Sequence, residues 1–164
     1  MADLLVHVGA AYPAARLLRD GRLRALVYLG LCLPDLLYKS LLYGLGASTW
    51  ICETSHAPLG AVPFCYLLAL FFERDWRARA FGALWGGSLA HILVDAGKSY
   101  MGSGVILWGF PFTMDMGEAG LYAPEEMILL MPAALGLVLL TELALSRRAT
   151  SSRGPTAPSP ARSR

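Results

Sequence analysis

The residues best placed for chemistry in this chain are a histidine and an aspartate in the stretch SLAHILVDAG. His91 and Asp95 are four residues apart, so on an α-helix their side chains share one face, one turn apart. An imidazole and a carboxylate at this spacing can bind one cation together. Alternatively, one of them binds the metal and the other orients it through a hydrogen bond. A hydrogen bond that joins two helices is the structural alternative for the same pair.

Three further ionisable residues lie inside or beside apolar runs, where such groups are energetically unfavourable and therefore mark functional positions. His7 lies in the first run, Asp35 follows Pro34 in the second, and His56 immediately precedes the third. Every histidine of the chain is thus a candidate. The predicted metal ligands are His7, Asp35, His56, His91 and Asp95.

The ligand types narrow the choice of ion. Imidazole and carboxylate together suit Zn, Mn or Fe, and we expect a divalent ion, with Zn favoured over Mn or Fe. Such an ion could lower the pKa of a bound water to about 7 and supply hydroxide for hydrolysis. Three histidines and two aspartates are enough ligands for one catalytic ion, but they leave few ligands for a second. Asp35 and Asp95 are also the candidate catalytic residues, because one of them could act as the base.

The composition indicates a membrane protein. Of 164 residues, 55% are apolar and only 16% are charged, whereas soluble domains usually carry about 25% charged residues. The net charge of +2 is due to five C-terminal arginines, without which nine basic residues face twelve acidic ones. No nucleic-acid partner is therefore expected. Cys32, Cys52 and Cys65 lack the spacing of a disulfide framework or a metal motif.

Five apolar segments are candidate helices: residues 2–18, 24–45, 58–72, 80–97 and 126–145. A bilayer core of about 30 Å needs roughly 20 helical residues, so 126–145 fits best and 58–72 is marginal. Pro34 and Asp35 predict a break in the second segment. The sequence therefore predicts an all-α integral membrane protein, a bundle of four to five short transmembrane helices. Whether the first helix crosses fully stays open.

The charge pattern predicts the orientation of these helices. Arginines cluster before the second segment, in the ERDWRAR connector and after the last segment. By the positive-inside rule these regions face the cytoplasm, and the connectors 46–57 and 98–124 face outward. If the first helix enters from outside and the second breaks at Pro34, all five candidate ligands reach a similar depth in the outer half of the bilayer. Histidines with unrelated structural roles would not need to agree in depth, so we expect a cluster.

The outward segment 98–124 is rich in aromatic residues and glycine. Its aromatic residues, Trp108, Phe110 and Phe112, could form an interfacial belt, or the segment could be a lid or re-entrant loop over a site. Lys98 at its start is expected to extend to the membrane interface, with contact to an anionic substrate group as the alternative. Glu53 is expected to be a solvated loop carboxylate, with a role as base or extra ligand as the alternative.

The chain divides into two parts by composition. Residues 1–146 are expected to form the membrane-embedded helical domain. Residues 147–164 are rich in Pro, Ser, Ala and Arg, which predicts a disordered basic cytoplasmic tail.

Several motifs together resemble a known family. His7, LPD at 33–35, SHAPLG at 55–60, SLAHILVDAGKS at 88–99 and WGFPF at 108–112 are similar to the bacterial membrane-bound predicted metal-dependent hydrolases, the YdjM-like family. The resemblance covers about residues 3–115. It implies a short multi-helix inner-membrane protein and metal-binding roles for His7, Asp35, His56, His91 and Asp95. Family members often carry a second acid after the Pro-Asp pair, where this chain has Leu36 and Leu37, and two histidines in the middle loop.

The sequence therefore predicts a metal-dependent hydrolase that is a multi-pass protein of the bacterial inner membrane. A lipid or phosphoester substrate near the outer face is expected, because a membrane lipid could arrive laterally at a site of that depth. Two alternatives stay open. One is a small transporter or ion-conducting protein with a His/Asp relay, and the other is a structural membrane protein whose polar residues only join helices.

Overall fold

The computed structural model of the chain describes residues 2–99 and 106–151. These residues are mostly helical, with six α-helices: α1 (Ala2–Leu17), α2 (Gly21–Lys39), α3 (Thr49–Glu53), α4 (Val62–Ala69), α5 (Arg74–Asp95) and α6 (Met127–Ser151). The short elements are a π-helical turn at Ser40–Gly44, 3-10 turns at Thr54–His56 and Pro124–Glu126, and the strands β1 (Ile106–Leu107) and β2 (Met116–Gly117). The strands pair antiparallel, with Ile106 opposite Gly117. The predicted helical fold class is thus confirmed, with one small two-stranded ladder added.

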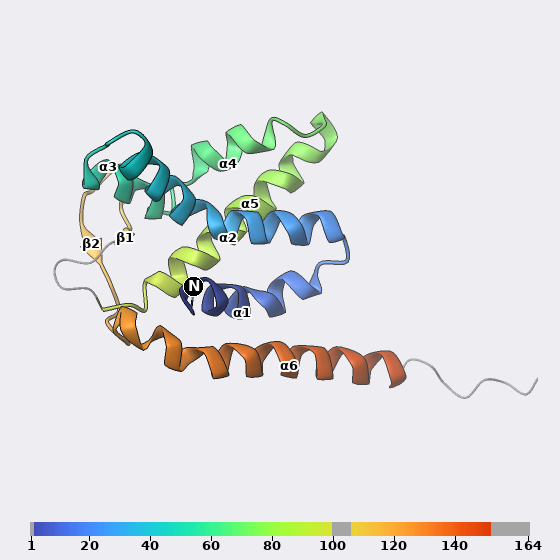
Figure 1. The fold of residues 1–164 in the computed structure, drawn as a ribbon. Coiled ribbons are helices and arrows are strands. Elements are labelled where there is room, and N and C mark those ends of the chain that lie inside the picture. Colours follow the sequence, from blue (N-terminus) through green and yellow to red (C-terminus); the bar gives the residue numbers. More distant parts are fainter. Residues whose placement is uncertain (1, 100–105, 152–164) are drawn as a thin grey trace, which may run out of the picture.

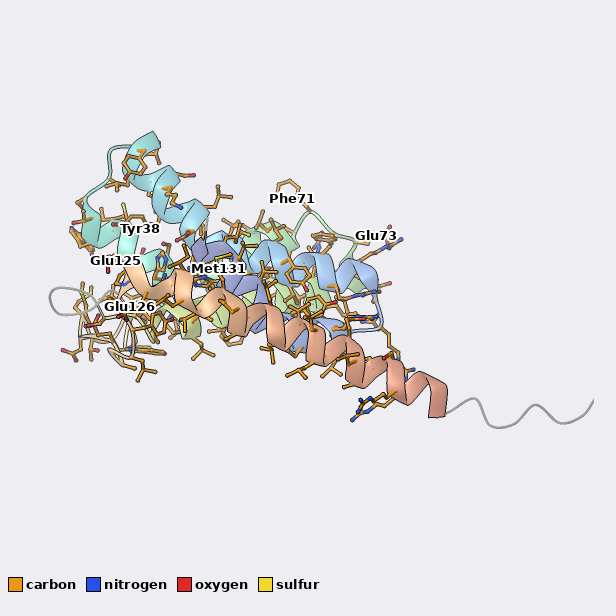
Figure 2. All side chains as sticks on the ribbon, turned by 60° about the horizontal axis from the view of Figure 1, so that its bottom comes forward. Tyr38, Phe71, Glu73, Glu125, Glu126 and Met131 are labelled. Carbon is orange, nitrogen blue, oxygen red and sulfur yellow. The ribbon has the colours of Figure 1, made fainter. Side chains whose placement is uncertain are left out.

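The helices form a bundle centred on α2 and α5. These two helices make the largest contact in the described chain, α1 packs on α2 and α5, α4 packs on α5, and α6 packs along α1. Figure 1 shows that α2 and α5 run toward the same end, where α3 and the strands lie. The opposite end holds the α1–α2 connection, the α4–α5 connection and the end of α6. Figure 2 shows the same separation, with Tyr38 and Glu125 at one end and Phe71 and Glu73 at the other.

Helix α2 continues through Pro34, so the predicted break at Pro34 and Asp35 is wrong. A proline has no N–H to donate to the carbonyl four residues earlier, which here belongs to Gly30. The hydroxyl of Ser88 on α5 donates to that carbonyl at 2.9 Å. A neighbouring helix therefore supplies the missing hydrogen bond, as happens for prolines in membrane helices.

The contact between α2 and α5 depends on two glycines. A Cβ on Gly30 would lie 2.0 Å from the carbonyl oxygen of Leu84, and a Cβ on Gly87 would lie 2.0 Å from that of Val27. Backbone therefore meets backbone at this crossing. Any side chain at Gly30 or Gly87 would push the helices apart.

Two helical stretches of the described chain are long and apolar enough to cross a membrane, Gly21–Gly44 and Pro124–Arg148. This number is smaller than the four to five predicted. Helix α4 has only eight residues, because its flanks Leu70–Phe72 and Ala57–Ala61 form turns. Helix α5 begins at Arg74, so most of the charged ERDWRAR connector forms its first turns. Along α6, large apolar side chains such as Leu129 and Leu140 are exposed.

Helix α6 also extends beyond the predicted domain boundary at residue 146. It continues to Ser151, with Arg148 in its last turn, where a cation interacts favourably with the helix dipole. The rest of the predicted disordered tail, residues 152–164, lies outside the described residues.

The close α2–α5 crossing predicts opposite effects at two adjacent glycines. Gly87→Ala should destabilise the protein by about 1–3 kcal/mol, because the added methyl group overlaps the α2 backbone. Gly86→Ala should leave the stability unchanged or raise it by up to about 1 kcal/mol, since a Cβ there has nothing within 4 Å. Unfolding of the two variants in detergent, followed by circular dichroism, measures the difference. Equal stabilities would contradict the backbone contact.

Candidate metal centre

The structure brings all five predicted site residues together. Helix α1 contributes His7, α2 contributes Asp35, the 54–56 turn contributes His56, and α5 contributes His91 and Asp95. The three histidines and Asp95 are buried, whereas the Asp35 side chain is 39% exposed. These residues come from four separate elements, so the cluster is a product of the tertiary fold.

Asp95 lies at the centre of this cluster. Its Oδ1 is 3.0 Å from Nε2 of His7, and its Oδ2 is 3.0 Å from Nε2 of His91 and 3.7 Å from Nε2 of His56. The ammonium of Lys98 also contacts Oδ1. All three imidazoles therefore meet one carboxylate.

Asp35 approaches the same histidines from the more exposed side. Its Oδ1 lies 3.6 Å from Nε2 of His56 and 3.8 Å from Nε2 of His91. Its Oδ2 accepts a hydrogen bond from Nζ of Lys39 at 3.2 Å. Two triads result, His7–His91–Asp95 and Asp35–His56–His91, and within each triad the ligand-type atoms lie within 4.8 Å of one another. His91 belongs to both.

The donor set and its spacing fit a divalent ion. Two ligands about 2.1 Å from a tetrahedral zinc ion lie about 3.4 Å apart, and the five imidazole–carboxylate separations run from 3.0 to 3.8 Å. His91 adds a second observation. Both of its ring nitrogens are buried without a hydrogen bond among the described residues, although Nε2 lies 3.0 Å from Oδ2 of Asp95. Buried nitrogens in native proteins normally have a partner, and coordination would provide one.

Ser55 orients the ring of its neighbour His56 so that Nε2 of the histidine faces the cluster. The Ser55 hydroxyl lies 2.7 Å from the Cys52 carbonyl oxygen, to which it donates, and 3.1 Å from Nδ1 of His56. A hydroxyl has one proton, and Ser55 donates it to Cys52. In the contact between Ser55 and His56, Nδ1 of the ring therefore carries a proton and donates it to the serine oxygen. The lone pair of His56 is then on Nε2, the atom that faces both aspartates. Such a hydrogen bond behind a metal ligand orients the ring.

The position of Lys98 is the main difference between the site predicted from the sequence and the site in the structure. Its predicted extension to the membrane interface is wrong, because the residue is 4% exposed and contacts Asp95. The chain after α5 explains this burial. Residues 119–122 pair with residues 96–99, which follow α5, through Ala119 N to Ala96 O at 2.6 Å and Ser99 N to Tyr122 O at 2.7 Å. A backbone bridge between Lys98 and Tyr122 holds the Lys98 backbone beside the site.

The rest of the outward connector is only partly described, since residues 100–105 lie outside the described chain. Trp108 and Phe112 are exposed, whereas Ile106 and Leu107 are buried, and β1 contacts the turn that carries His56. The exposed rings do not distinguish an interfacial belt from a lid, and the buried strand contacts the turn that carries His56.

Other contacts around the site were missed at the sequence level. The Asp35–Lys39 pair has i,i+4 spacing, which could have indicated it. The ring of Tyr38 packs edge-on against His56 at 5.6 Å, a contact without a local sequence signal. Glu53 belongs to neither triad. It is half-buried, and this burial raises the pKa of its carboxyl, with nearby His56 offsetting part of the rise.

Comparisons with protein-family models, curated proteins and solved structures give no significant match. The geometry of the site is therefore the basis for assigning a function to this chain.

The unequal burial of the two aspartates predicts unequal effects in the metal-free protein. Asp95→Ala should cost about 3–5 kcal/mol of unfolding free energy, because it leaves the buried Lys98 ammonium without this carboxylate. Asp35→Ala should cost no more than about 1 kcal/mol, because Lys39 is largely exposed. Equilibrium unfolding with a chelator present measures both. Adding Lys98→Met to Asp95→Ala should restore much of the loss, and a double variant as unstable as the single one would refute the buried pair.

Proposed function

We propose that this chain is a metal-dependent hydrolase of the bacterial inner membrane. The observation that carries the proposal is the convergence of three imidazoles and two carboxylates in one cluster, in which the histidine shared by both triads, His91, has buried nitrogens without a hydrogen bond among the described residues. A cluster that served only to join helices would be expected to satisfy the hydrogen-bonding atoms of such a residue.

Two helices are long and apolar enough to cross a membrane. We propose that the other helices of the bundle are embedded in the membrane beside them. The arginine-bearing ends of α2, α5 and α6 lie together at one end of the molecule, and the site elements lie toward the other (Figure 1). With the arginines in the cytoplasm, α1, α4 and α5 would be embedded beside α2 and α6, as a multi-pass protein. The triads would then lie near the outer face.

Separate roles follow for the two aspartates. Asp95 is enclosed by three imidazoles and Lys98, so it serves as a ligand and holds the histidines in place. Asp35 is half-exposed and borders a cavity, so its carboxylate is the one that can contact and orient an incoming water molecule. His7, His91 and Asp95 would hold the ion, with His56 and Asp35 available to it or to a second ion. A bound divalent ion would supply Lewis acidity and a water of lowered pKa.

The expected substrate class is a lipid or phosphoester. A site near the outer face is within reach of lipids that diffuse in the membrane, and the exposed side of the cluster is the one that carries Asp35 and Lys39. A phosphoester also matches the Lewis-acid chemistry of zinc, which stabilises charge on phosphoryl oxygens.

Elemental analysis tests the metal site directly. Protein purified in detergent with zinc supplied should retain about one ion per chain or more. His91→Ala should lose nearly all of it, because His91 belongs to both triads. Ser55→Ala should weaken zinc affinity by about 10- to 100-fold through loss of the hydrogen bond behind His56. Tyr43→Ala, at an exposed position outside the site, is the control and should retain the metal. Wild-type protein without bound metal would refute the proposal.

A His/Asp relay in a transporter is the second candidate. The row of ionisable side chains from Asp35 through His91 and Asp95 to His7, with neighbouring N–O separations of 3.0 to 3.8 Å, favours it, because ionisable chains inside membranes carry protons or cations. Reconstitution into liposomes separates the two functions. Ion flux without phosphodiester hydrolysis would select the relay, and hydrolysis without flux would select the enzyme.

A further inference from the structure

A cavity of about 380 Å³ opens between α1 and α2 and reaches the metal triads. Leu4 and Leu36 line it from the two helices, and each has about half of its surface exposed. Asp35 and Lys39 line its α2 side, and His7 and His91 also border it. This volume lies within the range of small-molecule sites, which are mostly apolar with a few placed polar groups.

The lining of this cavity combines two kinds of side chain. Leucines line it from α1 and α2. Two histidines and an aspartate of the triads form the polar part. A ligand that matches both parts is an amphiphile, with an apolar chain between α1 and α2 and a polar group against the triads.

The charges of the site indicate the sign of that polar group. Asp35 and Asp95 carry two negative charges, and Lys39 and Lys98 carry two positive ones, each paired with an aspartate. With neutral imidazoles, the net charge of these four side chains is zero, so a bound divalent ion would leave the site with an excess of positive charge. An anionic group would neutralise that excess. Lys39 is placed to contact it, since its side chain is 64% exposed and lines the cavity.

We propose that this cavity binds an amphiphile with a phosphate-type anionic group, which enters sideways between α1 and α2. Its apolar chain contacts Leu4 and Leu36, and its anionic group lies between Lys39 and the metal ligands. This inference rests on the proposed metal-dependent function, and it specifies the substrate class as an anionic lipid rather than a water-soluble phosphoester.

Two phosphonates test the proposal, because their carbon–phosphorus bond resists hydrolysis and their headgroups are alike. Hexylphosphonate carries an apolar chain, and methylphosphonate does not. Titration calorimetry on the zinc-loaded protein in detergent should give an affinity for hexylphosphonate at least about tenfold higher, because burying several methylene groups is favourable. Equal affinities would overturn the proposal and indicate a water-soluble phosphoester.

Three variants locate the two contacts. Leu36→Trp should fill the cavity mouth and remove the preference for hexylphosphonate, whereas Leu29→Trp, at a half-exposed position on α2 outside the cavity, should keep it. Lys39→Gln should weaken both phosphonates by a similar factor of about five. A preference that survives Leu36→Trp would place the chain elsewhere, and unchanged affinities in Lys39→Gln would remove that residue from the site.

Zinc content, measured on the same samples, separates this inference from the function on which it rests. Wild-type protein that retains zinc but binds the two phosphonates equally would refute the lipid cavity and leave the metal site intact. Wild-type protein without zinc would refute both.

Discussion

The crossing of α2 and α5 is the constraint on which the rest of the structure depends. Gly30 and Gly87 let the two backbones touch, and the Ser88 hydroxyl supplies the hydrogen bond that Pro34 cannot make to Gly30. Asp35 lies just beyond this contact on α2, and His91 and Asp95 lie just beyond it on α5. The contact therefore determines the position of one half of the cluster relative to the other.

The second organising feature is the enclosure of charge around Asp95. A lone carboxylate buried among apolar side chains is strongly unfavourable unless opposite charges and hydrogen bonds compensate it. Lys98, held by the segment 119–122, and Nε2 of His7 provide that compensation at Oδ1. Oδ2 remains directed at His91 and His56. The fold thus stabilises a buried carboxylate in an apolar bundle and still presents it to the histidines.

The site was more predictable than the fold around it. His91 and Asp95 could be paired from their spacing alone, because an i,i+4 pair on a helix is a local property. His7, Asp35 and His56 could be added because ionisable residues in apolar segments are rare and a common depth followed from the charge pattern. The break at Pro34 could not be excluded, since the hydroxyl that prevents it belongs to a residue 58 positions from its acceptor in sequence. The burial of Lys98 likewise depends on a segment more than 20 residues away.

The sequence by itself determined the local quantities: the apolar segments, of which 126–145 is the clearest candidate span, the concentration of arginines in particular connectors, and five residues of metal-ligand type. These follow from composition and periodicity, which act over one or two helical turns. Only the tertiary structure decided how closely the five approach one another, which aspartate is buried, and that a cavity between α1 and α2 leads to them. Those properties depend on backbone contacts and hydrogen bonds between distant segments. The energies of these contacts are set by packing in three dimensions, and the contacts produce no periodic pattern in the sequence.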